Sequence, residues 1–208
     1  MMKKLLSLVL AALLLFPAAL SLAKTVEPET EIDRFAGKTV HATVGAYSEE
    51  TGTFTVTVYD CDRYDRGDAA KLEAGDTLLA GGYLYKITGQ NDIDDTAIFL
   101  CEDGEEIYFG DAYDGGDDLI ARSTMDDRIF MKAVAVLHLP AAEGIVYEDD
   151  SDPDLDAQMT VTKGLENILK VQAEKEEFSN GFNYYATSVT LNENLEIVKI
   201  HQDYDVAQ

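Results

Sequence analysis

Apolar and polar residues alternate strictly through residues 38–59. The apolar set occupies the even positions, namely Val40, Ala42, Val44, Ala46, Phe54, Val56 and Val58. Threonines and His41 occupy the odd positions, and the polar stretch 48–52 interrupts the pattern once. Alternation with a period of two places one set of side chains on each face of a strand. The segment therefore predicts a β-hairpin with one buried face.

Several further strands follow with hairpin spacing. Gly81-Gly82 separates segments 77–80 and 83–88, and a Gly-Gly pair suits a tight hairpin turn because both central positions need positive φ. A third hairpin is predicted from 97–101 and 106–109, and one helical turn from 69–73. The longest predicted strand, 128–139, is apolar on both faces over 133–137 and is expected to end at Pro140. A short strand is predicted at 145–147.

The last fifty residues change character. Apolar positions at helical spacing predict a helix over about 164–177, followed by strands at 185–191 and 195–204. The predicted fold class is therefore mainly β, a small antiparallel barrel or roll built from hairpins, with one C-terminal helix plus hairpin. Residues 24–147 form the expected barrel-like domain, 148–156 an acidic linker or loop, and 157–208 a helix-hairpin unit packed on the first.

The N-terminus has the pattern of a signal peptide over residues 1–23. Lys3 and Lys4 precede an apolar stretch that ends at Ser21-Leu22-Ala23, which puts small residues where a signal peptidase cleaves. A membrane anchor is disfavoured, because the stretch is shorter than the ~20 residues that a span needs. The sequence thus predicts a secreted or periplasmic protein with no membrane span after cleavage.

Charge narrows the classes of partner. The chain has 40 Asp and Glu against 16 Lys and Arg, a formal charge of −24 that becomes −26 without the two signal-peptide lysines. A nucleic-acid-binding surface needs a concentrated basic field, so no nucleic acid is expected as a partner. The excess lies in loops, since 20 of the 23 Asp fall between residues 60 and 156.

Clustered aspartates raise the question of a metal ion, because Ca²⁺ prefers hard oxygen ligands. The cluster at 150–156 fails the EF-hand pattern, as Leu155 takes the place of the required Gly. A better candidate is the loop of residues 111–118, where two Gly allow the backbone to fold carboxylates around one ion. Its predicted metal ligands are Asp111, Asp114, Asp117 and Asp118. Solvated turns that keep the protein soluble are the alternative, and no other cofactor is indicated.

Two cysteines, Cys61 and Cys101, leave two alternatives open. In an exported chain they permit one disulfide, and otherwise they are two separate buried thiols.

Signatures of nucleophilic catalysis and of a zinc site are missing from the sequence. No serine has a G-x-S-x-G setting, and His41, His138 and His201 are far apart in the chain. A carboxylate pair for glycoside hydrolysis is available in any chain this acidic. Aromatic residues for a sugar subsite would have to come from Tyr83, Tyr85, Tyr108 and Tyr113.

Two resemblances add to this picture. Residues 73–78 followed by 82–87 resemble the entry to SH3-like small barrels, with a Gly-Asp turn, a strand, a tight turn and an aromatic-rich return strand. This implies a fold and no activity. The signal peptide, the acidic β-rich middle and the tail 185–204 resemble uncharacterised exported β-rich bacterial proteins.

The sequence favours a non-catalytic binding or interaction module with an unknown extracellular or envelope ligand. The alternative is a secreted hydrolase of the carbohydrate-active type that uses a carboxylate pair.

Overall fold

The structure is a computed structural model that describes residues 32–112, 116–152, 158–178 and 181–203. The chain divides into two units, 1–34 and 35–208. The predicted signal peptide lies outside the described residues. Among the described elements, the 3-10 helix η1 (Asp33–Phe35) begins in the first unit, and all the others lie in the second.

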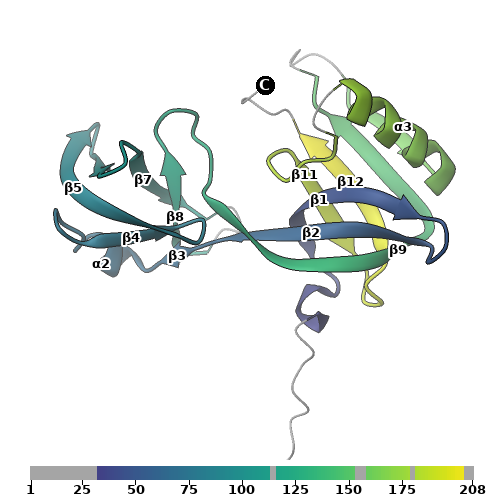
Figure 1. The fold of residues 1–208 in the computed structure, drawn as a ribbon, viewed down its shortest axis with the longest axis horizontal. Helices are drawn as coiled ribbons and strands as arrows, with labels where there is room; N and C mark the ends of the chain where they lie inside the picture. The colour runs from purple at the N-terminus through teal and green to yellow at the C-terminus, as the bar shows by residue number, and fades with distance from the viewer. Residues whose placement is uncertain (1–31, 113–115, 153–157, 179–180, 204–208) are drawn as a thin grey trace, which may run out of the picture. The chain divides into compact units, whose positions relative to one another are not determined.

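The fold is mainly β, as the sequence predicts, with two six-stranded sheets and one C-terminal-region helix, α3 (Leu165–Phe178) (Figure 1). The first sheet has the order β10-β9-β12-β11-β1-β2, and its strands are β1 (Thr39–Ser48), β2 (Thr53–Cys61), β9 (Met131–Asp150), β10 (Thr160–Lys163), β11 (Thr187–Leu191) and β12 (Ile197–Asp203). The second has the order β3-β8-β7-β6-β5-β4, with β3 (Arg63–Tyr64), β4 (Thr77–Ala80), β5 (Tyr83–Ile93), β6 (Thr96–Cys101), β7 (Glu106–Asp111) and β8 (Leu119–Ser123).

Strand β9 closes the first sheet into a ring. Its first half pairs antiparallel with β2, and its second half pairs in parallel with β12. The ladders therefore run from β9 through β2, β1, β11 and β12 back to β9. The antiparallel pairing of β1 with β11 joins the N-terminal hairpin β1–β2 to the C-terminal hairpin β11–β12, and the parallel pairing of β12 with β9 closes the ring.

The predicted end of this strand at Pro140 is wrong. β9 continues to Asp150 and includes the predicted short strand 145–147. Pro140 is the last residue paired with β2, opposite Thr53, and Ala141 is the first paired with β12. A proline lacks the N–H that a ladder uses. It is tolerated here because it lies where β9 changes partner.

The ring encloses the larger hydrophobic core, and α3 packs on β9 and β10 beside it. Ile168 of α3 is fully buried, as the predicted apolar stripe requires. One turn later, Gln172 Nε2 donates to the carbonyl oxygens of Val44 and Gly45, at 3.1 and 2.9 Å. The register of β1 against β2 shifts after Val44, so this side chain satisfies carbonyls where the ladder is irregular.

The second sheet is a curled, fully antiparallel half-barrel with its own core of residues such as Leu78, Ile87 and Ile107. Its Gly-Gly turn is confirmed, since Gly81 and Gly82 have φ of +57° and +81°. Its edge strands β3 and β4 are linked by one side chain. The Tyr64 hydroxyl donates to Leu79 O at 2.8 Å and accepts from Leu79 N at 2.7 Å.

Other differences from the sequence prediction are local. The helical turn predicted at 69–73 occurs earlier, as α2 (Arg66–Ala69), because Asp65 Oδ1 accepts the N–H groups of Gly67 and Asp68 and caps it there. Strands β8 and β10 were not predicted. The predicted linker 148–156 begins inside β9, and 153–157 lie outside the described residues, so the domain division stays a prediction.

We expect Tyr64→Phe to lower the free energy of unfolding by about 1–3 kcal/mol, because it leaves the N–H and C=O of Leu79 without their partner in a partly buried place. Urea unfolding measures the change. Tyr83→Phe is the matched control, since Tyr83 is 71% exposed, and it should stay within about 0.5 kcal/mol of the original protein. Equal effects of the two substitutions would contradict a structural role for the Tyr64 hydroxyl.

Candidate functional site

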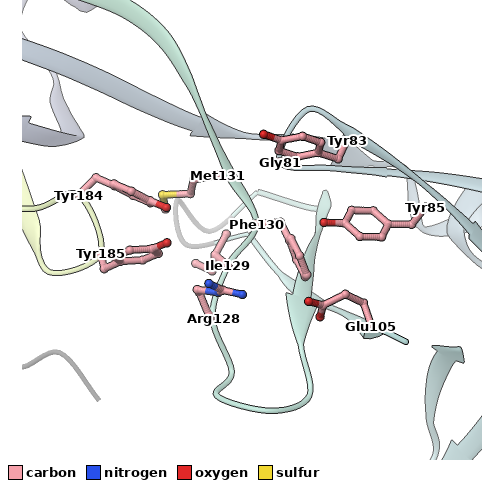
Figure 2. Close-up of a pocket in the computed structure, with 10 residues that line it drawn as sticks. All are labelled: Gly81, Tyr83, Tyr85, Glu105, Arg128, Ile129, Phe130, Met131, Tyr184 and Tyr185. Atoms are coloured by element: carbon pink, nitrogen blue, oxygen red, sulfur yellow. The ribbon is translucent and has the colours of Figure 1, made fainter. Parts of the chain in front are cut away.

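Aromatic side chains from distant parts of the chain line a pocket of about 180 Å³. We call it the tyrosine pocket, and its lining residues are Gly81, Tyr83, Tyr85, Glu105, Arg128, Ile129, Phe130, Met131, Tyr184 and Tyr185. Figure 2 shows Tyr83 and Tyr85 on one side and Tyr184 and Tyr185 on the other, with Phe130 between them. The residues come from the β4–β5 turn and β5, from the turn before β7, from the segment that leads into β9 with its first residue Met131, and from the segment before β11.

The Gly-Gly turn positions Tyr83 and Tyr85. Gly82 N donates to Asp62 Oδ2 at 2.9 Å, and the other oxygen of Asp62 accepts from Lys132 Nζ on β9. The Asp62 side chain is only 8% exposed. A Cβ on Gly81 would lie 3.1 Å from the carbonyl oxygen of Met131, so the turn is packed tightly against the start of β9.

Three tyrosines in ring contact support the opposite wall. The rings of Tyr59 and Tyr184 are stacked with centroids 4.0 Å apart, and those of Tyr184 and Tyr185 are 3.9 Å apart. Tyr59 belongs to β2, so the ring sheet supports this wall. Tyr185 N donates to Asn183 Oδ1 at 3.1 Å, which fixes the backbone of the pair.

Arg128 and Glu105 are the charged groups of the pocket. The Arg128 guanidinium carbon lies 5.9 Å from the ring centroids of both Phe130 and Tyr185, within cation–π range. Its Nε lies 3.7 Å from Asp126 Oδ2. In Figure 2 the guanidinium and the Glu105 carboxylate both point towards the middle of the pocket.

The phenols of Tyr85 and Tyr184 are neutral at ordinary pH. Burial is the main cause that raises the pKa of Tyr85, and the carboxylates of Glu105 and Asp103 add to it. Burial also raises the pKa of Tyr184, helped by its hydrogen bond with Tyr185. Burial works to lower the pKa of Arg128, but the contacts with Tyr185 and Asp126 outweigh it and raise the pKa. The pocket therefore offers neutral hydroxyls beside a permanent cation.

Two of the predicted metal ligands pair with arginines. Asp111 forms an ion pair with Arg66, and Asp118 lies 4.0 Å from Arg63. Asp117 is exposed, and Asp114 lies outside the described residues. Within the part of the chain that the structure describes, no three His, Cys, Asp or Glu side chains are grouped to hold a metal ion. The Ca²⁺ site stays a prediction.

The two cysteines are both buried and belong to different hydrophobic clusters, and the choice between the two alternatives stays a prediction. Cys61 packs with Ala112 and Ile120, whereas Cys101 belongs to the core of the half-barrel. Burial, with the nearby Asp103 and Glu105, raises the pKa of Cys101 to about 11, so this thiol is protonated and unreactive at neutral pH.

The sequence identified two of the four tyrosines that line the tyrosine pocket. Tyr83 and Tyr85 were candidates for a sugar subsite and do line it, while Tyr108 instead donates to Asp127 and Tyr113 lies outside the described residues. Arg128, Glu105 and the Tyr184-Tyr185 pair were missed. The adjacent tyrosines beside Asn183 were the available signal, but nothing local shows that they meet Tyr59.

Two histidines that are far apart in the chain share one face of the first sheet. His41 is paired with Ser188, and Ser188 with His201, so the three residues form a row across β1, β11 and β12. His201 lies between Glu148 and Asp203, at 3.3 and 2.9 Å. The contact with Glu148 lacks hydrogen-bond geometry at Nδ1. Burial lowers the pKa of His41, although Asp203 and Asp60 partly oppose the shift.

We expect Asp62→Ala to destabilise the protein by about 1.5–3 kcal/mol, because it removes a buried charged acceptor from both Gly82 N and Lys132. Thermal or urea unfolding measures this. The control is Asp68→Ala, which breaks an ion pair with Lys71 whose side chains are 74% and 72% exposed, and should cost below about 1 kcal/mol. A cost for Asp62→Ala no greater than that of the control would refute the anchoring role.

The lowered pKa of His41 predicts a loss of stability in mild acid. Below its ordinary pKa of 6.5 the unfolded state takes up a proton that the folded state resists, so stability falls as the pH drops from 6.5 through the folded pKa. We expect His41→Gln to show a smaller decrease in Tm between pH 7.5 and pH 5 than the original chain. The control is His138→Gln, since His138 is an exposed residue of β9. If Tm decreased equally with pH in the two variants, the loss of stability would not be due to His41.

Comparison of the chain with protein-family models, with curated proteins and with solved structures finds no match. Among the described residues, no helix is both long enough and apolar enough to cross a membrane. The function therefore has to be argued from the geometry of the site itself.

Proposed function

We propose that this protein is an exported, non-catalytic binding module and that the tyrosine pocket is its ligand site. The observation that carries the proposal is the convergence of four tyrosines and one arginine on a single hollow. Tyr83 and Tyr185 leave 71% and 45% of their surface exposed there. Large aromatic side chains gathered at the surface are characteristic of binding sites.

The arrangement favours binding over hydrolysis. A glycoside hydrolase needs two carboxyl groups about 5–10 Å apart on either side of the scissile bond. Glu105 is the single carboxylate among the residues that line the tyrosine pocket. The buried thiol of Cys101, with its raised pKa, is not suited to act as a nucleophile.

The pocket is also rigidly supported, which suits recognition. The Asp62 and Lys132 pair anchors one wall, and the stack of Tyr59, Tyr184 and Tyr185 anchors the other. A preformed site loses less conformational entropy when a ligand binds. Export of the chain, which we propose from its N-terminal pattern, would expose this site to ligands in the envelope or the surroundings of a bacterial cell.

The test is saturation-transfer NMR with a mixture of small saccharides, dipeptides and nucleosides. We expect at least one class to give signals with the original protein, and the double variant Tyr83→Ala, Tyr185→Ala to lose them while keeping its Tm. Incubating the mixture overnight and analysing its composition checks for turnover. Binding that survives the double variant, the absence of binding by every class, or breakdown of a bound compound would each reject the proposal.

A further inference from the structure

The size of the tyrosine pocket limits what enters it. Its volume of about 180 Å³ is below the roughly 300–1,000 Å³ of sites that enclose drug-sized ligands. One ring fits, whereas a bulky polycyclic ligand or a whole oligomer does not. A longer ligand must therefore present a single unit to the pocket.

The walls select for a ring with apolar faces and polar edges. Tyr83 and Tyr185 each combine a flat apolar surface with a hydroxyl that is both donor and acceptor. Figure 2 shows the hydroxyls of Tyr85, Tyr184 and Tyr185 directed into the space between the two walls. A ligand that offers C–H faces for stacking and several hydroxyls at its edge satisfies both features at once.

The charged groups favour a neutral ligand with adjacent hydroxyls. The guanidinium of Arg128 presents parallel N–H donors, and the carboxylate of Glu105 presents two acceptor oxygens. Two vicinal hydroxyls match the spacing of either group. The two charges are opposite, and Asp126 beside Arg128 adds a further carboxylate, so the pocket has no surplus of positive charge with which to select an anion.

The charge of the whole chain supports the same choice. At −24, the field of the protein repels anionic ligands such as nucleotides and phosphorylated sugars. Small cations would meet Arg128, which carries a permanent charge inside the pocket. A neutral polyhydroxylated ring avoids both penalties.

We propose that the tyrosine pocket binds one neutral pyranose ring of a glycan, packed between Tyr83 and Tyr185 and hydrogen-bonded through its hydroxyls to Arg128 and Glu105. The inference rests on the proposed function, because it names the ligand class of the same site. The remainder of the glycan extends into solvent past the exposed rings.

The intrinsic fluorescence of the chain gives a direct assay, since it has 11 Tyr and no Trp. The probes are tetrasaccharides of β1,4-linked glucose, α1,4-linked glucose, β1,4-linked mannose and β1,4-linked N-acetylglucosamine, titrated against the full mature chain and checked by calorimetry. We expect at least one to bind with a Kd below about 1 mM, a free energy of about −4 kcal/mol. Tyr83→Ala and Arg128→Gln should each weaken that binding at least tenfold.

Leu84→Ala is the matched control. Leu84 is the next residue of β5, is 74% exposed and does not line the pocket, so its removal should leave Kd within twofold. Tyr83 is similarly exposed, and its substitution is therefore expected to preserve the Tm. If a variant does lower the Tm, Glu105→Gln supplies a second test. It keeps the size of the side chain but replaces one of the two oxygens that would accept hydrogen bonds from the sugar hydroxyls.

Each outcome decides the inference. Failure of all four glycans to bind, or binding that Tyr83→Ala, Arg128→Gln and Glu105→Gln leave unchanged, overturns it. A decaproline peptide is the competing probe, since extended proline segments also dock on aromatic grooves. If decaproline binds in the pocket and the glycans do not, the sugar assignment fails while the proposed binding function stands. If neither binds and the mixed library is also silent, both fail.

Discussion

The change of partner along β9 is the constraint on which the rest of the structure depends. One strand of 20 residues pairs with β2 up to Pro140 and with β12 from Ala141. The pairing of β1 with β11 joins the N-terminal hairpin to the C-terminal hairpin, but without the change of partner this sheet would stay open at β12. With it, the two hairpins close one ring around a shared core, and the start of β9 at Met131 is held against Cys61 at the end of β2. The segment 128–131 therefore has a fixed position, and it forms the floor of the tyrosine pocket.

The acidic composition takes a different meaning once the partners of individual carboxylates are known. Asp65 caps a helix, Asp62 binds a backbone N–H and Lys132, and Asp149 lies 3.0 Å from Lys175. Burial raises the pKa of Asp149, but hydrogen bonds from Ser151, Lys175 and Tyr147 more than compensate and lower it. The chain has only 16 Lys and Arg, and Lys132 and Lys175 each pair with an aspartate from another part of the chain. Other carboxylates, such as Glu49, Glu50 and Asp103, lie in exposed turns, where they keep the surface solvated.

The sequence predicted the parts of the fold that local patterns determine. Alternation identified β1 and β2, the Gly81-Gly82 pair identified the turn between β4 and β5, and helical spacing identified α3. The prediction failed at Pro140. A proline ends a strand only where the neighbouring strand would accept its missing N–H, and which strand lies beside Pro140 is known only from the fold. The site was predictable to the same extent. Tyr83 and Tyr85 share a strand face and were found, whereas Arg128 and Tyr184 reach them through long-range pairing.

The tyrosine pocket has supporting residues behind its walls and exposed residues at its front. Asp62 and Tyr59 lie behind the two walls and hold them through a buried ion pair and a ring stack. Tyr83 and Tyr185 occupy the front and are 71% and 45% exposed. Tyr185 also contacts Tyr184 and Arg128, whereas the side chain of Tyr83 is the more exposed of the two. Because the supporting contacts lie behind Tyr83, its position in the hollow follows from the Gly-Gly turn that precedes it, and its side chain remains accessible from solvent.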